Sequence, residues 1–164
     1  MDAIHEIEDL RRHANEGDPE SQYKLGWRYS AGRDVQQNDE EAVKWLRQAA
    51  EQGHTKSQNI LGMMYSIGHG VRQDGAEAVK WLRKAAEQGL AQSQHDLGVM
   101  YANGQGVPQN YMEACMWWKL AAGQGNEEAR QKHDIVAKML TASQVADAHP
   151  APDPGTRKDE RDSR

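Results

Sequence analysis

The sequence predicts an all-α fold: a right-handed α-solenoid of about three and a half helix-turn-helix repeats of 36 residues, with a C-terminal capping helix. Residues of the same type recur at a fixed 36-residue step, which is typical of a stacked array. Within each step, the apolar residues follow helical spacing. The recurring sets are Leu25-Gly26, Leu61-Gly62 and Leu97-Gly98; Tyr29, Tyr65 and Tyr101; Trp45, Trp81 and Trp117; and Ala49-Ala50, Ala85-Ala86 and Ala121-Ala122.

The repeat domain is expected to span residues 1–148 and to begin with the second helix of an incomplete repeat, residues 1–17. Asp2 falls in the N-cap position of that helix. Its apolar residues align with those one period later: Ile7, Leu10, Ala14 and Gly17 with Val43, Leu46, Ala50 and Gly53. Three full repeats are predicted to follow, over residues 18–53, 54–89 and 90–125.

The first helix of each repeat carries an apolar stripe, represented by Leu25 and Tyr29 in the first repeat. In the first repeat, this helix begins with Asp18-Pro19-Glu20, an N-cap residue followed by a first-turn proline and an acid. The expected ends are glycines that fit a left-handed residue past a helix: Gly32, Gly68 and Gly104.

Glycines inside the first helices need a structural reason, because each costs about 1 kcal/mol relative to alanine. The opposing second helix carries small residues such as Ala42 and Ala49. We therefore expect tight antiparallel helix pairs, with Gly26, Gly62 and Gly98 at the points of close approach.

The second helix of each repeat begins at a variant of the capping box, in which an Asx residue stands three positions before glutamate. The pairs are Asn38 with Glu41, Asp74 with Glu77, and Asn110 with Glu113. The helix is expected to close at the glycine that ends the repeat, at Gly53, Gly89 or Gly125.

Residues 126–148 are expected to cap the array, because a solenoid needs an element that covers its last apolar face. A first helix restarts at Asn126, but His133-Asp134 replaces the Leu-Gly pair. A capping box at Thr141-x-x-Gln144 predicts a short helix to about Ala148. Residues 149–164 hold three prolines and almost no apolar residue, so we expect a disordered tail.

Charge and composition argue against several classes of function. A net charge of −5 gives no electrostatic basis for binding nucleic acid or acidic lipid. No apolar run approaches the ~18 residues of a membrane span, so no membrane insertion is expected. The acidic N-terminus lacks the apolar core of a signal peptide, which favours the cytoplasm, or the periplasm or exterior if a leader was trimmed. We expect a monomer.

The sequence offers no reaction centre. The seven histidines share no single repeat position and form no His-x-x-x-His pair, so neither a metal nor another cofactor is expected. Gly68-His69-Gly70 is interpreted as a repeat turn, because no strand precedes it as in a phosphate-binding loop. Cys115 stands in phase with Val43 and Val79, and is interpreted as a small buried hydrophobe. We expect that the protein is not an enzyme.

The central repeat contains the patterns Leu61-Gly62-x-x-Tyr65-x-x-Gly68-x-Gly70-Val71 and Ala78-Val79-Lys80-Trp81-Leu82-Arg83-Lys84-Ala85-Ala86-Glu87-Gln88-Gly89. With these residues it resembles a known family, the Sel1-like repeat, a bacterial relative of the tetratricopeptide repeat. The resemblance covers about residues 3–148. It implies an α-solenoid that serves as an adaptor or scaffold between proteins.

The first repeat departs from this pattern in two places. Arg28 replaces the methionine of the later repeats, so a contact between repeats must change there. Asp34 replaces a turn glycine, which puts the shape of that turn in question, although aspartate tolerates the left-handed conformation better than most residues.

The expected partner-binding residues vary in type while the frame around them repeats. By analogy with tetratricopeptide geometry they line the concave face, and mixed aromatic, Met and polar side chains suit recognition. They are Tyr23, Trp27, Asn59, Met63, His95 and Val99. In the other interpretation, Trp27, Met63 and Val99 only pack between repeats. A second candidate site is Met112 and Met116, for which packing under the C-terminal cap is the alternative.

The predicted function is a non-catalytic protein–protein interaction module, an adaptor or scaffold that binds a partner protein or peptide through its concave face. The alternative is a dedicated inhibitor, an immunity-type protein that blocks a toxin or enzyme. An adaptor with exchangeable partners is expected to bind at the micromolar level, and an inhibitor far more tightly.

Overall fold

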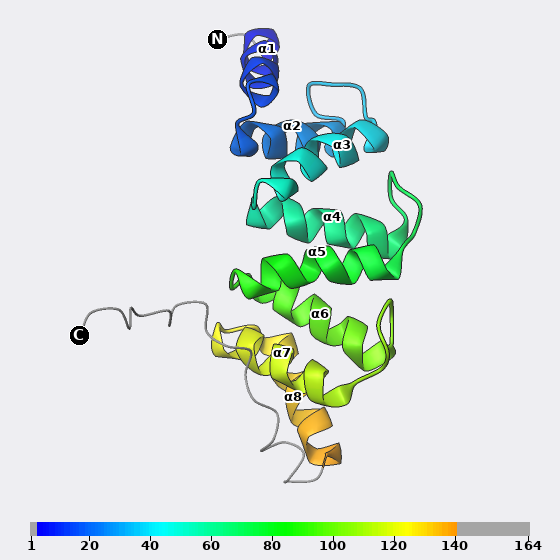
Figure 1. Ribbon diagram of the computed structural model, residues 1–164. Helices are drawn as coiled ribbons and strands as arrows, with labels where there is room; N and C mark the ends of the chain where they lie inside the picture. Colours follow the sequence, from blue (N-terminus) through cyan, green and yellow to red (C-terminus); the bar gives the residue numbers. More distant parts are fainter. Residues whose placement is uncertain (1–2, 141–164) are drawn as a thin grey trace, which may run out of the picture.

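The computed structural model describes residues 3–140, and this part of the chain consists of eight α-helices without a strand. They are α1 (Ala3–Asn15), α2 (Pro19–Ala31), α3 (Asp39–Glu51), α4 (Thr55–Ile67), α5 (Gly75–Glu87), α6 (Ala91–Asn103), α7 (Tyr111–Gly123) and α8 (Glu127–Met139). Figure 1 shows them as one elongated stack with α1 at one end and α8 at the other. The predicted all-α solenoid is confirmed. Asp2, the capping box at Thr141, the helix to Ala148 and the tail 149–164 lie outside the described residues.

The predicted antiparallel pairs form, with α2 on α3, α4 on α5 and α6 on α7. We call α2, α4, α6 and α8 the first helices, and α1, α3, α5 and α7 the second helices. The first helices of the three full repeats end, as predicted, at left-handed glycines: Gly32, Gly68 and Gly104.

The second helices begin where the capping pattern predicts, but only half of the capping box forms. The side chain of Asn38 accepts a hydrogen bond from the backbone N–H of Glu41 at 3.1 Å, and Asp74 and Asn110 do the same in their repeats. In a full capping box the glutamate accepts a return bond from the N-cap N–H, but here the N–H of Asn38 donates to the carbonyl of Tyr29 at 3.0 Å. Glu41 pairs instead with Lys44 on the helix surface.

The core runs along the array and contains the leucine of each Leu-Gly pair: Leu25, Leu61 and Leu97. The close approach predicted at the neighbouring glycine is confirmed, since a Cβ on Gly62 would lie 2.7 Å from Leu82 Cγ. In the third repeat, Trp118 occupies the position of Leu82. Its indole N–H donates to the carbonyl of His95 at 3.1 Å.

A ladder of glutamines joins the repeats, and the apolar pattern does not predict it. Gln58 is buried and donates to the carbonyl of Ala50 on the preceding helix at 3.1 Å. Its own amide oxygen accepts from Gln88 at 2.7 Å. The same two bonds recur one period earlier and later, at Gln22 and Gln94. The 36-residue recurrence of these glutamines is the signal in the sequence that could have identified them.

A second ladder joins arginine to tyrosine. Arg47 on α3 donates to the hydroxyl of Tyr65 on the next first helix, and Arg83 donates to Tyr101 in the same way. The recurring tyrosines Tyr65 and Tyr101 therefore also connect their repeats to the preceding ones.

The turn at Asp34 keeps the shape of its equivalents. Asp34 is the one non-glycine residue of the described chain with a positive φ, at 61°, against 67° at Gly70. A Cβ on Gly70 would overlap the backbone of Asp39, where α3 begins. Because Asp34 carries a Cβ, the start of α1 cannot approach its turn as α3 approaches Gly70. Figure 1 shows α1 lying across the direction of α2.

Candidate protein-binding surface

The residues that vary at constant repeat position differ in exposure. Trp27 on α2 and Met63 on α4 are 43% and 39% exposed, although both are large hydrophobic side chains. Val99 on α6 is half-buried and packs against the core. Packing between repeats therefore accounts for Val99, whereas Trp27 and Met63 leave much of their surface open to solvent.

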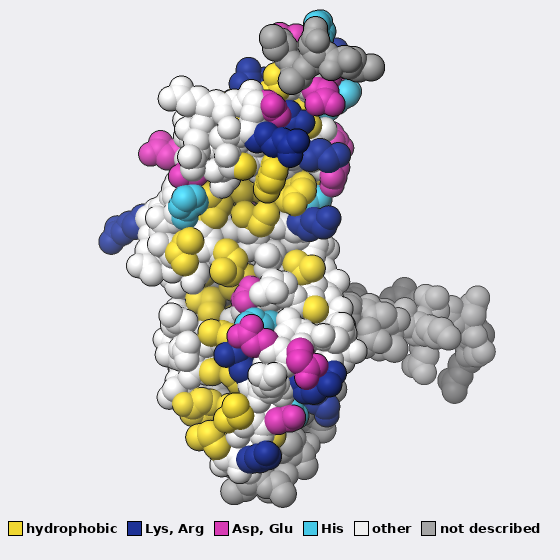
Figure 2. Space-filling view, turned by 180° about the vertical axis from the view of Figure 1, so that it is seen from behind, with side chains coloured by type: hydrophobic (Ala, Val, Ile, Leu, Met, Phe, Trp, Pro, Cys, Tyr) yellow, Lys and Arg dark blue, Asp and Glu magenta, His cyan; other side chains and the backbone are white. Residues whose placement is uncertain are grey.

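Exposed hydrophobic side chains continue along the first helices beyond the predicted set. Ile135 on α8 stands two periods after Met63, and Ile67 and Met139 follow one helical turn later on their helices. Each of these three is more than half exposed. We call Trp27, Met63, Ile67, Ile135 and Met139 the apolar row. Figure 2 shows an interrupted band of hydrophobic side chains along one face of the array.

The sequence pattern does not mark the α8 part of the apolar row, because the Leu-Gly pair is absent from this helix. Without that pair, the segment indicates only a cap. The repeat position of Ile135 was nevertheless available, since it stands one period after Val99.

The other three residues of the predicted partner-binding set, Tyr23, Asn59 and His95, make contacts within the array. The ring of Tyr23 lies 4.8 Å from that of His54, and Asn59 accepts a hydrogen bond from Ser93 at 2.7 Å. His95 is only 7% exposed, with Nδ1 3.0 Å from Asp96 Oδ1. These residues thus offer a partner less free surface than Trp27 and Met63.

The electrostatics near Tyr23 are set by a contact between repeats. His54 Nε2 lies 3.1 Å from Glu20 Oε2, and Nδ1 accepts the N–H of Ser57 at the start of α4. The hydrogen bond from His54 holds the pKa of the Glu20 carboxyl below its usual range. The Glu20 carboxylate also pairs with Lys24 at 3.2 Å, so its negative charge is compensated at the edge of this surface.

The alternative site on α7 is less open. Met112 and Met116 are both half-buried, and Met116 packs against the core cluster that includes Val136 of α8. Tyr111 beside them is 39% exposed, and its hydroxyl accepts a hydrogen bond from Gln109. The packing interpretation thus fits Met116.

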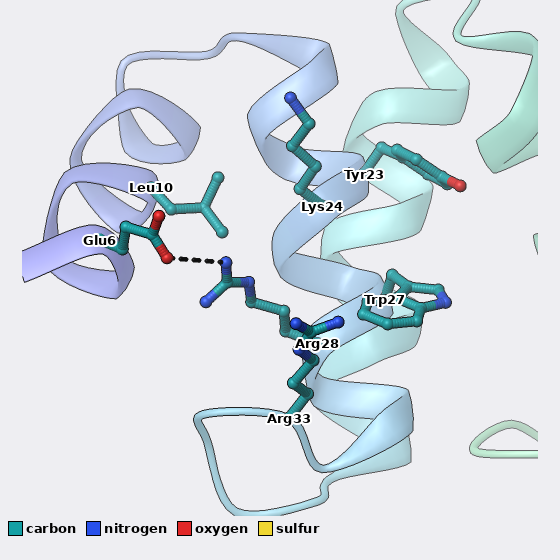
Figure 3. Close-up of a pocket in the computed structure, with 7 residues that line it drawn as sticks. All are labelled: Glu6, Leu10, Tyr23, Lys24, Trp27, Arg28 and Arg33. Carbon is teal, nitrogen blue, oxygen red and sulfur yellow. Dashed lines mark ion pairs between the residues drawn. The ribbon is translucent and has the colours of Figure 1, made fainter. Parts of the chain in front are cut away.

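A pocket of about 400 Å³ lies at the α1–α2 end of the apolar row (Figure 3). Arg28 occupies its centre and donates to Asp34 at 2.8 Å, so the two departures of the first repeat pair with each other. The guanidinium of Arg33 lies 5.9 Å from the centre of the Trp27 ring. The lining residues are Glu6, Leu10, Tyr23, Lys24, Trp27, Arg28 and Arg33.

The described residues contain little that could support a reaction. Among residues 3–140, no three His, Cys, Asp or Glu side chains are grouped so that they could hold a metal ion. Burial raises the pKa of the Cys115 thiol, which keeps it protonated and poorly nucleophilic at neutral pH. None of the helices in this part of the chain has the length and apolarity needed to cross a membrane.

Known proteins share this sequence pattern and fold. The family model of the Sel1 repeat matches residues 19–54, 55–90 and 91–126. The crystal structure of a Sel1 repeat protein from Oxalobacter formigenes is 39% identical with a TM-score of 0.73, over 79% of this chain and 98% of that one. No curated protein matches the chain.

A second solved structure is that of a protective antigen present in uropathogenic Escherichia coli strains, which displays an SLR fold. It is 35% identical with a TM-score of 0.73 and covers 84% of this chain. The match covers 34% of the antigen, so the chain spans about a third of that protein's length.

Proposed function

Because the chain belongs to the Sel1 repeat family, whose members are generally protein-interaction modules, we propose that it is a non-catalytic adaptor that binds a segment of another protein. The contact surface in this proposal is the apolar row, and by analogy with tetratricopeptide geometry we expect it on the concave face. A segment laid across the first helices would meet Trp27 first, then Met63 and Ile67, and finally Ile135 and Met139.

The observation that carries the proposal is the clustering of exposed apolar surface. Five of the six large exposed hydrophobic residues among the described ones belong to the apolar row. Single exposed hydrophobic residues are ordinary, but a repeated row on equivalent helix faces is typical of an interaction surface. Large aromatic side chains contribute most to binding when a partner desolvates them, which makes Trp27 the expected anchor.

We expect Trp27→Ala and Met63→Ala each to weaken partner binding by about 1–3 kcal/mol, because each removes apolar surface at the contact. The immobilised protein would capture its partner from the native host, mass spectrometry would identify it, and calorimetric titration would give the Kd. Both variants should keep the wild-type helicity, since the two side chains are exposed.

Lys80→Glu on the second helix α5 is the matched control, and it should leave the Kd nearly unchanged. The wild-type Kd also separates the two roles, because micromolar binding favours an adaptor and far tighter binding an inhibitor. If Trp27→Ala and Met63→Ala bind like the wild type while Met116→Glu abolishes binding, the site lies on α7 and the proposal is wrong.

A further inference from the structure

The pocket between α1 and α2 gathers the residues that distinguish the first repeat. Lys24, Arg28 and Arg33 stand where the second repeat has isoleucine, methionine and histidine. We propose that this pocket receives an acidic segment of the partner protein, with an apolar side chain against Leu10 and Trp27 and a neighbouring carboxylate on the arginines. This inference rests on the proposed function and adds the chemistry of the partner.

Arg28 is poorly explained as a packing residue. Its side chain is 20% exposed, whereas Met64 at the same place in the next repeat is only 4% exposed and part of the core. A partly buried guanidinium loses some of its hydration, and bound carboxylates compensate for that loss. Asp34 binds Nη1 at 2.8 Å and thereby fixes the orientation of the planar group.

The other side of the Arg28 guanidinium has a weaker partner. Glu6 on α1 lies 3.7 Å from Nη2, which is too long for a hydrogen bond, and its side chain is 63% exposed. Figure 3 shows this carboxylate reaching Arg28 across the gap between the two helices. A carboxylate from a partner could replace it with better geometry, because an arginine fork binds carboxylates most strongly when the hydrogen bonds are direct.

Arg33 is the lining cation that favours an acidic ligand. Three cations and one acid line the pocket, but Lys24 already pairs with Glu20 at 3.2 Å and Arg28 with Asp34 at 2.8 Å. Arg33 is 68% exposed, and its nearest carboxylate, on Asp34, is 3.8 Å away and already bound to Arg28. Arg33 is therefore able to take a second carboxylate.

The apolar lining supplies the other half of the site. In Figure 3, Leu10 lies on one side of Arg28, while Trp27 and Tyr23 lie on the other. The volume of about 400 Å³ is within the usual range for ligand pockets, about 300–1,000 Å³. Trp27 also belongs to the apolar row, so one segment bound along the first helices would contact both the row and the pocket.

A random library of 12-residue peptides displayed on phage tests this inference with the full chain as target. We expect the selected peptides to carry Asp or Glu beside an aromatic or aliphatic residue. A synthetic copy of the most enriched peptide should bind Arg33→Glu about tenfold more weakly. Glu6→Gln should tighten its binding, since the competing carboxylate is removed. Arg72→Glu, the same charge change in the equivalent loop of the next repeat, should bind like the wild type.

The double variant Arg28→Met/Asp34→Gly restores the residues of the later repeats, and it should fold with wild-type helicity and lose the peptide. Selected peptides without acidic residues, or equal binding to wild type and Arg33→Glu, would overturn the inference, as would a library that yields no binder. If the peptides ignore Arg33→Glu but lose binding to Met63→Ala, the pocket fails while the proposed function stands. If Arg33→Glu abolishes their binding while Met63→Ala leaves the natural partner's Kd unchanged, the row proposal fails and the pocket stands.

Discussion

Leu61→Ala is expected to lower the free energy of unfolding by about 2–5 kcal/mol. Leu61 has no exposed surface and lies in the central repeat, in the cluster that joins the helices on both sides. The cavity would not collapse easily, because the adjacent Gly62 already approaches Leu82 as closely as a helix permits. Such a loss is a large share of the ~5–15 kcal/mol that stabilises a typical domain.

Chemical denaturation followed by circular dichroism measures the free energy of unfolding, and a thermal melt gives the melting temperature. Met63→Ala, two positions away on the exposed side of α4, is the matched control and should change stability by no more than about 0.5 kcal/mol. If the melting temperature of Leu61→Ala stayed within about a degree of wild type, the assignment of this repeat position to the core would be wrong.

The parts of the fold that could be predicted from sequence are those governed by local chemistry. Asp74 accepts the N–H bonds at the start of α5 because a short acceptor side chain reaches the first turn whatever lies beyond it. The position of Leu61 in the core follows in the same way from helical spacing. These features need no knowledge of the neighbouring repeat.

The features that the apolar pattern does not predict depend on groups that a neighbouring helix presents. The N–H of Asp74 donates to the carbonyl of Tyr65, so the glutamate half of the capping box has no role at that atom. Gln58 looks like a surface residue in an amphipathic pattern, but the carbonyl of Ala50 makes its burial favourable by accepting its hydrogen bond. Only the packing of α3 on α4 reveals that partner.

The candidate site also contains some features that the sequence predicts and others that depend on packing between helices. Trp27 and Met63 stand out in the sequence because they vary within a constant frame, and their exposure agrees with a role at a surface. The burial of His95 was not predictable, because the residues that cover it include Glu128 on α8, 3.5 Å from Nε2. Likewise, Arg28 and Asp34 are two separate departures from the repeat pattern in the sequence, and only the structure shows that they pair.

Gly106→Ala is expected to destabilise the array by about 3 kcal/mol or more, the sum of backbone strain and a steric clash. Gly106 has a φ of 72°, a left-handed conformation that costs alanine about 1–2 kcal/mol. A Cβ at this position would also overlap the carbonyl group of Gly75, at the start of α5. Because that obstacle is backbone, it cannot rotate away as a side chain would, and the loop must separate from the preceding repeat.

Gly89→Ala isolates the strain from the clash. Gly89 has a φ of 92°, but a Cβ there would meet no atom within 4 Å, so only the added backbone strain should lower the stability. The difference between the two variants in chemical denaturation therefore measures the contact between the loop and α5. The native Asp34 supports this reasoning, since the corresponding loop carries a Cβ where α1 departs from the regular stack. Equal losses for Gly106→Ala and Gly89→Ala would mean that the repeats do not depend on this close approach.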